Sequence, residues 1–234
     1  MLGVIVALPI EARTLTRSPV PLGRAIDLGP QIKLVVTGMG RERALAGAER
    51  LHRAGATALL NWGCAAALRP GIAPGRLLVP AEFVLDGGRR IRAHEAWHQR
   101  LLQALAGLSP LPAPLAGTAA VLTTPAAKRA LAESAQAVGA DMESAFLAAW
   151  AEARRLPFAA VRAVADDADT VIPSAVAAAT DASGQIAPWR LLGALGRHPG
   201  QIPALIRLGR RFGAARRTLE RATARLLPKT FCRP

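Results

Sequence analysis

Short apolar runs alternate with amphipathic segments along most of this chain, and this alternation limits the folds that it can adopt. Runs rich in Val, Ile, Leu or Ala predict buried strands at residues 2–8, 32–37, 57–61, 76–85, 117–122 and 158–165. Amphipathic spacing predicts helices at residues 41–54, 95–106 and 142–155. Strands that alternate with helices form a largely parallel sheet covered by helices on both faces. The sequence therefore predicts an α/β protein.

The overall composition is that of a globular protein. The chain has 234 residues, of which 51% are hydrophobic, and this is enough for a large buried core. No basic segment precedes the apolar residues 2–8, and no apolar stretch is long enough for a membrane span, so neither a signal peptide nor a transmembrane helix is expected. Cys64 and Cys232 lie too far apart in sequence for a disulfide framework or a CxxC metal motif. These features favour a cytoplasmic location.

Positive charge is concentrated near the C-terminus. Residues 187–234 contain eleven Arg or Lys and one acid, whereas residues 1–186 contain nineteen and fifteen. From Ile202 to Leu226, apolar residues recur at steps of three and four with arginines on the opposite side, which predicts an amphipathic helix. We expect a main domain at 1–186 and a basic helical extension at 187–234 packed on it. The arginine face is interpreted either as the solvated side of a docked helix or as a contact for an anionic membrane at the inner membrane face, whereas the lack of interleaved aromatic residues argues against nucleic acid.

Three carboxylates follow directly on the apolar run 158–165, from Asp166, Asp167 and Asp169. Ligands of α/β sheets bind at the carboxyl ends of the strands. Because crowding of like charges raises the pKa of a carboxyl group, we expect one of the three to keep its proton near neutral pH and to act as a proton donor. The alternative interpretation is a solvated strand end or a helix cap.

Three further positions carry groups suited to chemistry at the same edge of the sheet. The turn Gly38-Met39-Gly40-Arg41 joins a strand to a helix, where free backbone amides bind anions or polar ligands. Glu11 follows the first strand, where a carboxylate activates water, and Glu143 opens a helix, where it accepts hydrogen bonds from a diol. The alternative interpretations are a plain tight turn at 38–41, a helix-capping acid at Glu11 and an acid that compensates a helix dipole at Glu143.

These residues belong to a series of motifs that resembles the purine nucleoside phosphorylase and nucleosidase superfamily, and especially its methylthioadenosine and adenosylhomocysteine nucleosidase branch. The motifs follow the order of the family over most of the chain: Glu11, Thr37-Gly38-Met39-Gly40, Asn61-Trp62-Gly63-Cys64-Ala65, Pro74-Gly75-Arg76-Leu77-Leu78-Val79-Pro80, Asp141-Met142-Glu143-Ser144 and Asp166 to Asp169. Residues 197–205 are most similar to the hopanoid-associated phosphorylases. The resemblance implies a three-layer α/β/α sandwich with a mixed central sheet, a homodimer, and no metal or redox cofactor.

The resemblance also implies a reaction and a role for each matching residue. The reaction is cleavage of the N-glycosidic bond of an adenine-type nucleoside, with adenosylhopane as the substrate of the narrower branch and water or inorganic phosphate as the acceptor. Asp166 matches the acid that protonates N7 of the departing purine, Glu143 the group that holds the ribose hydroxyls, and Glu11 the carboxylate that positions the attacking water. Further substrate contacts are expected from Met142, Cys64, Thr123, Thr124 and Pro125.

Two departures from the family pattern bear on activity and on the acceptor. The loop Gly63-Cys64-Ala65-Ala66-Ala67 lacks the usual hydroxyl and carries methyl groups where the family has glycines. This loop makes a non-catalytic nucleoside-binding or membrane-associated scaffold the alternative function. Asn61 stands where phosphorylases often have an arginine, which favours water over phosphate, although Arg41 is placed to substitute for that arginine.

A competing motif is present at His94-Glu95-Ala96-Trp97-His98, which matches the HExxH pattern of zinc peptidases. Such a site needs a third protein ligand, and residues 99–132 contain no His, Asp, Glu or Cys. We therefore interpret these residues as exposed polar positions of a surface helix and keep a zinc peptidase as a remote alternative.

Overall fold

The chain folds around one mixed β-sheet. The structure is a computed structural model that describes residues 1–173, 176 and 199–234. The ten strands of the sheet are β1 (Leu2–Val6), β2 (Ala25–Gly29), β3 (Ile32–Val36), β4 (Ala58–Ala67), β5 (Leu77–Leu78), β6 (Glu82–Val84), β7 (Arg90–Arg92), β8 (Leu115–Gly117), β9 (Gly139–Asp141) and β10 (Phe158–Asp166). Their order is β2-β3-β1-β4-β9-β8-β6-β7, and β10 pairs with β4 and β5. Parallel pairing of β3, β1, β4 and β10 places their carboxyl ends at one edge.

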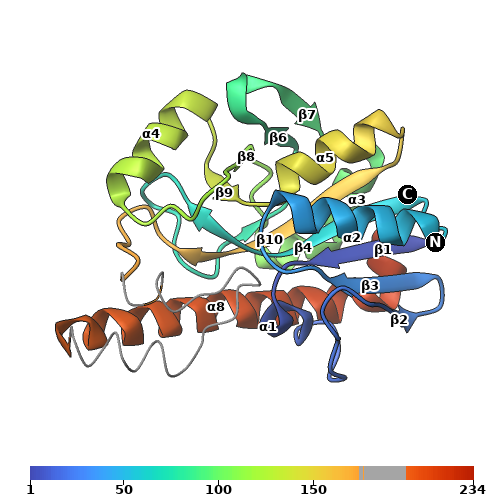
Figure 1. The fold of residues 1–234 in the computed structure, drawn as a ribbon, viewed down its shortest axis with the longest axis horizontal. Coiled ribbons are helices and arrows are strands. Elements are labelled where there is room, and N and C mark those ends of the chain that lie inside the picture. The colour runs from blue at the N-terminus through green and yellow to red at the C-terminus, as the bar shows by residue number, and fades with distance from the viewer. Residues whose placement is uncertain (174–175, 177–198) are drawn as a thin grey trace.

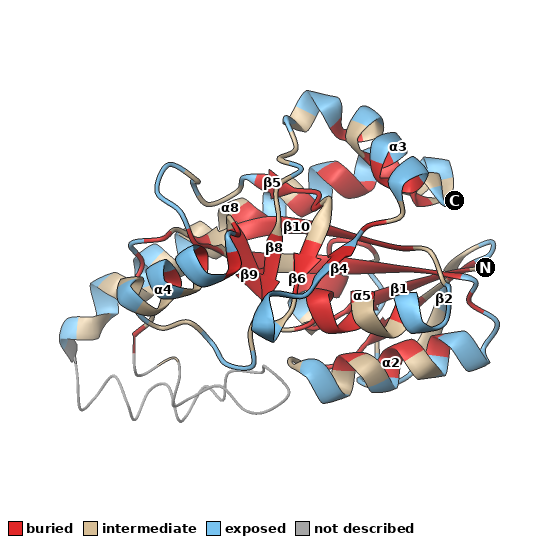
Figure 2. Cartoon of the chain, turned by 90° about the horizontal axis from the view of Figure 1, so that it is seen from above, coloured by how far each residue is buried: buried red, intermediate tan, exposed pale blue. Residues whose placement is uncertain are grey.

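Helices cover both faces of this sheet (Figures 1 and 2). The α-helices are α1 (Pro9–Ala12), α2 (Arg41–Arg53), α3 (Glu95–Leu105), α4 (Pro125–Ala135), α5 (Ser144–Ala153) and α8 (Ile202–Leu226). Short 3₁₀ helices are η1 (Asp86–Gly88), η2 (Ala106–Leu108), η3 (Pro199–Gln201) and η4 (Leu227–Cys232). Helices α2 and α5 pack together on one face, and α3 and α8 pack together on the other. This arrangement confirms the expected three-layer sandwich with a mixed sheet.

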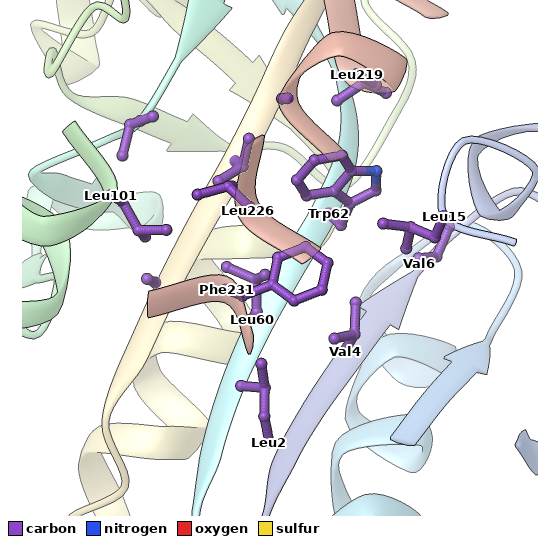
Figure 3. Packing of buried hydrophobic residues seen from close by; sticks show 14 of the residues in the cluster. Leu2, Val4, Val6, Leu15, Leu60, Trp62, Leu101, Leu219, Leu226 and Phe231 are labelled. Atoms are coloured by element: carbon purple, nitrogen blue, oxygen red, sulfur yellow. The ribbon is translucent and has the colours of Figure 1, made fainter. Parts of the chain in front are cut away.

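The C-terminal helix is part of the core. Its residues Ala215, Leu219, Ala222 and Leu226 are fully buried and face β10 and β4. Phe231 in η4 lies edge-on against Trp62 of β4, with ring centroids 5.7 Å apart (Figure 3). Fully buried aliphatic and aromatic side chains each contribute roughly 1.5–3 kcal/mol. This layer of side chains therefore fixes the two strands whose ends carry the polar groups described below.

The periodic helices and the strands β1, β3 and β10 match their predictions, whereas several other short elements do not. Helices α2, α3, α5 and α8 were all predicted, the last with its bounds unchanged. The strand predicted at 117–122 is wrong, because β8 ends at Gly117 and the following residues form a loop. The run 76–85 forms two short strands, and β4 continues to Ala67. The expected domain boundary between 186 and 187 lies outside the described residues.

No helix in the described part of the chain combines the length and the apolar character needed to cross a bilayer. Helix α8 carries its arginines as predicted on its exposed side, with one exception. Arg211 turns toward the sheet, where its Nη2 lies 2.8 Å from Asp167 Oδ2. The first turns of α8 also expose Ile202 and Ile206. The exposed side of α8 therefore combines arginines with apolar side chains in the first turns of the helix.

Candidate active site

A cavity of about 170 Å³ lies at the carboxyl ends of β1, β4 and β10. Its wall includes three of the predicted carboxyl groups, which come from different parts of the chain: Glu11, Glu143 and Asp166. Cys64 and Met142 also line it, as expected from the sequence. The parallel pairing of the strands brings these residues together, because each follows or ends a strand at the same edge.

Glu11 is held rigidly by two backbone amides. The Leu8 amide donates to its Oε2 at 2.9 Å, and the Cys64 amide donates to its Oε1 at 2.7 Å. Burial raises the pKa of Glu11, and the guanidinium of Arg162 partly opposes this rise. Gly63 has φ of +153°, and a Cβ at this position would lie 2.6 Å from both Glu11 Oε1 and Arg162 Nη1. A glycine is therefore required where β4 passes the carboxylate.

Arg162, which the sequence predictions missed, is a buried partner of two carboxyl groups of the site. It lies in the middle of β10 and is fully buried. Its Nε lies 2.6 Å from Asp141 Oδ2, and its Nη2 lies 3.5 Å from Glu143 Oε2. Its Nη1 has no hydrogen-bond acceptor among the described residues. An arginine inside an otherwise apolar strand was a usable signal, because a buried charge requires an opposite charge beside it.

Asp141 links this arginine to the start of α5. Its Oδ1 accepts hydrogen bonds from the amides of Glu143 at 3.1 Å and Ser144 at 2.8 Å. The Ser144 hydroxyl donates to Asp141 Oδ2 and accepts from Arg162 Nε at 3.2 Å. Asp141 thereby positions the backbone of Glu143, whose side chain reaches the cavity.

Glu143 accepts a hydrogen bond from the Gly40 amide at 2.8 Å. The pKa of Glu143 is raised to about 7, chiefly by burial and then by the negative charge of Asp141, while the positive charge of Arg162 opposes this rise. Glu143 therefore titrates near neutral pH. Its ionised form offers two oxygens for hydroxyl groups, and its partner Arg162 stabilises that form.

The contact with Glu143 corrects the prediction of an anion site at the turn 38–41. The Gly40 amide is taken by Glu143, and the Gly38 amide donates to the Ala7 carbonyl at 2.9 Å, so neither is free for a ligand. The Arg41 guanidinium lies over the Phe146 ring, 5.2 Å from its centroid, rather than at the cavity. Met39 is the residue of this turn that lines the cavity.

A pH measurement tests the environment of Glu143. The folded protein holds the Glu143 proton more tightly than the unfolded chain does, because the pKa of Glu143 is raised in the folded state. The free energy of unfolding is therefore expected to fall as the pH rises from about 4.5 to about 7. Urea unfolding at pH 5 and pH 8 should show a smaller difference in Glu143→Gln than in the wild type, by on the order of 1–3 kcal/mol. Glu95→Gln, at an exposed carboxyl, serves as the control. Equal pH dependence in Glu143→Gln and the wild type would contradict the assignment.

Asp166 ends β10 and is 9% exposed. Its Oδ2 contacts the ammonium of Lys128, a fully buried residue of α4 that the sequence predictions missed. Burial raises the pKa of Asp166, Lys128 opposes this rise, and Asp167 adds to it. The predicted direction is thus correct, but burial is a larger cause than crowding by neighbouring carboxylates. Asp169 is exposed.

The three residues expected to line the purine pocket lie beyond its wall. Thr124 caps α4 by accepting a hydrogen bond from the Ala127 amide at 3.2 Å, and Pro125 is the first residue of that helix. The Thr123 carbonyl accepts from the Ile172 amide at 3.0 Å. The wall is formed instead by the preceding loop, at Thr118, Ala120, Val121 and Leu122. The prediction therefore misplaced this wall by a few residues.

Cys64 faces the cavity with a neutral thiol. Burial raises the pKa of this thiol well above its usual range, and Glu11 raises it further. The thiol stands where the related family usually has a hydroxyl, so it offers a weaker hydrogen-bond donor beside Glu11.

The HExxH motif does not assemble a metal site. His94 caps α3, with its Nδ1 accepting from the Trp97 amide at 3.3 Å. His98 is buried rather than exposed as predicted, and its Nε2 lies 2.9 Å from the Val79 carbonyl. The described residues contain no cluster of His, Cys, Asp or Glu suited to a metal ion. Both imidazoles therefore have structural partners in the backbone.

The chain is similar to known proteins in sequence and in fold. The sequence pattern of the Phosphorylase superfamily matches residues 2–187. The 5'-methylthioadenosine/S-adenosylhomocysteine nucleosidase from Helicobacter pylori has a TM-score of 0.66 at 14% identity, over 95% of this chain and 97% of that chain. Futalosine hydrolase of Helicobacter pylori has a TM-score of 0.62 at 16% identity, over 70% of this chain and 87% of that chain.

A third solved structure extends the comparison to another organism. The 5'-methylthioadenosine/S-adenosyl homocysteine nucleosidase of Campylobacter jejuni has a TM-score of 0.61 at 17% identity, over 91% of this chain and 98% of that chain. At these identities the solved structures show a shared fold. No curated protein sequence matches the chain.

Proposed function

Because the chain belongs to the phosphorylase superfamily, we propose that it cleaves the N-glycosidic bond of an adenine-type nucleoside and releases the base. Its family and fold support a nucleosidase or nucleoside phosphorylase. One observation carries the narrower proposal: a single cavity is bordered by Asp166 from β10 and by the pair Glu11 and Glu143 from other strand ends. A nucleoside bound between them meets a carboxyl group at each of its reacting parts.

The chemistry of the bond suits this arrangement. Cleavage builds positive charge on the ribose and negative charge on the base, so an enzyme accelerates it by stabilising both. Asp166 gives a proton to N7 of the purine, which neutralises the leaving group. Glu143 accepts hydrogen bonds from the ribose hydroxyls, and Met142 packs against the sugar. Glu11 orients the attacking water and takes its proton.

The balance of buried charge favours water over phosphate as the acceptor. Two buried cations, Arg162 and Lys128, are already paired with carboxylates. The buried carboxyl groups around them outnumber them: Glu11, Asp141, Glu143 and Asp166. A phosphate dianion placed here would be repelled by the excess negative charge. A water molecule in the cavity beside Glu11 has a carboxylate to accept its proton.

Chromatography of the released base tests the proposal. The protein is incubated with adenosine, methylthioadenosine and adenosylhopane, with and without phosphate. We expect adenine and a free sugar at rates that do not depend on phosphate. Release that requires phosphate would overturn the choice of water, and no base from any of the three substrates would favour a nucleoside-binding scaffold instead.

A lipid-linked substrate such as adenosylhopane is the narrower form of the proposal. A second cavity of about 550 Å³ lies next to the first, and Ile172 lines both. Val171 and Leu208 add apolar surface to it, and Arg207 adds positive charge. A long apolar group at the 5' position of the ribose would extend from the first cavity past Ile172 into the second. A higher kcat/KM for adenosylhopane than for adenosine is the expected result.

An anionic membrane is the proposed source of such a substrate. The first turns of α8 expose Ile206 next to Arg207 and Arg210, which combines apolar insertion with attraction to acidic headgroups. Flotation with anionic vesicles is expected to recover the wild-type protein, and to recover less of an Ile206→Ser, Arg210→Glu double variant. Arg53→Glu, on α2 at the opposite face of the sheet, is the control. Equal recovery of all three proteins would count against membrane contact.

A further inference from the structure

Lys128 is a buried lysine whose contacts extend the proposed mechanism. It lies in α4, is fully buried, and contacts Asp166 Oδ2 directly. Its Nζ also donates to the carbonyls of Asp167 at 2.6 Å and Thr170 at 3.3 Å. Each proton of an ammonium group thus has an acceptor. The pair consists of a lysine cation and an Asp166 carboxylate, and a carboxylate has no proton to give.

An Asp166 carboxylate paired with a lysine cation can act as a proton donor only if the proton first moves to it from Lys128. A lysine cation beside a carboxylate and a neutral amine beside a carboxylic acid contain the same number of protons and the same total charge. Because both groups are largely buried, desolvation penalises the two separate charges, and this narrows the free-energy difference between the two forms. The proton is then available at Asp166 although it is stored on Lys128.

We propose that Lys128 is a positioning residue that holds Asp166 by one carboxyl oxygen and supplies the proton that Asp166 passes to the leaving base. This inference rests on the proposed function. One N–H bond of Lys128 breaks as an O–H bond forms on Asp166, and that proton moves to N7 as the glycosidic bond breaks. The attacking water gives its proton to the Glu11 carboxylate. Lys128 ends as a neutral amine, and both residues return to their starting forms by exchange with solvent after the products leave.

Of the described charged groups near Asp166, Lys128 is the cation that contacts its carboxylate directly. Asp167, in the same loop, is paired with Arg211 of α8, with Nη2 and Oδ2 at 2.8 Å. Cys64 of the neighbouring strand β4 lines the same cavity and carries a neutral thiol. Arg211 acts mainly on Asp167, whereas Lys128 touches Asp166 itself and is closed off from solvent. Proton exchange of the lysine therefore runs through Asp166.

Two substitutions separate proton supply from simple charge pairing. Lys128→Arg keeps a positive charge beside Asp166, but a guanidinium does not give up its proton in proteins. Lys128→Met removes both the charge and the proton. At pH 8 we expect both variants to lose about 10²-fold or more in kcat for adenine release, which is the typical scale for loss of one proton donor.

The pH profile of kcat provides the readout that a structural role would not move. The wild type should remain active until the pair loses its shared proton, well above the range of an isolated aspartic acid, whose pKa is about 4. In Lys128→Met the alkaline limb should move to lower pH by at least about one unit, because Asp166 must then hold the proton by itself. The acid limb reflects the ionisation of Glu143 and is read separately.

The outcomes distinguish failure of this inference from failure of the proposed function. Near-normal kcat and an unchanged pH profile in Lys128→Arg, with adenine released by the wild type, would overturn the role of Lys128 alone. Absence of adenine release by the wild type would overturn the proposed function. Thermal unfolding checks that each variant is folded. If neither variant folds, the pH profile of kcat for the wild type still tests the inference. An alkaline limb below about pH 6 would contradict a proton shared between Asp166 and Lys128.

Discussion

Replacement of Asp166 with asparagine is expected to lower the rate of adenine release by about 10² to 10⁴-fold, the usual effect of losing one placed proton donor. The amide has nearly the same shape as the carboxyl group, and its oxygen still accepts a hydrogen bond from Lys128. The base would then leave as an anion, which raises the barrier to bond cleavage. KM should change little, since the contacts with the sugar remain.

Asp86→Asn is the matched control for this variant. Asp86 is an exposed aspartate on the 3₁₀ turn η1, and it does not line the cavity. Its substitution is expected to leave kcat unchanged. Near-normal activity of Asp166→Asn, with both proteins folded, would remove Asp166 from the proposed role.

The largest loss of stability is expected from Arg162→Met. Methionine fills much of the space of the arginine, but it leaves Asp141 and Glu143 buried without their cation. Breaking a buried ion pair by removing one partner typically costs about 3–5 kcal/mol. The free energy of unfolding in urea should fall by this amount at pH 8, where the carboxyl groups are ionised.

The loss should shrink at pH 5, because Glu143 is protonated there in the folded protein. Arg92→Met, at a side chain that is 88% exposed, is the control and should change stability by no more than about 0.5 kcal/mol. A loss for Arg162→Met that is no larger than for the control would contradict the central position of this arginine in the network.

Two carboxyl groups of the site were predictable because each stands at the end of a predicted strand. Glu11 follows β1, and Asp166 ends β10, so the period of the apolar runs was enough to place them at one edge of a parallel sheet. Glu143 was identified from a different pattern, the start of a helix. Strand ends and helix starts can be recognised in a sequence without any knowledge of tertiary contacts.

The partners of these carboxyl groups were not predictable from local patterns. Gly40 and Glu143 are 103 residues apart, and their hydrogen bond uses an amide that the sequence alone leaves free. Lys128 lies in an Ala-rich helix that was not predicted, and nothing in its neighbours distinguishes it from an exposed lysine. Arg162 was different, since its apolar surroundings in the strand were already a sign of a buried ion pair.

The wall of the cavity was misplaced for a related reason. Ala119, Ala120, Val121 and Leu122 have the composition of a strand, but they follow β8 as a loop beside the cavity. Ala120, Val121 and Leu122 line the cavity, and Val121 is 50% exposed, so these apolar side chains do not belong to the core. Composition alone does not separate a buried strand from an apolar loop beside a cavity.

A crystal structure with a non-hydrolysable adenine nucleoside analogue tests the proposed roles of the three carboxyl groups. We expect N7 of the base within hydrogen-bond distance of Asp166 and the ribose hydroxyls at Glu143, with a water beside Glu11. An analogue bound elsewhere, or bound with its base turned away from Asp166, would contradict these roles.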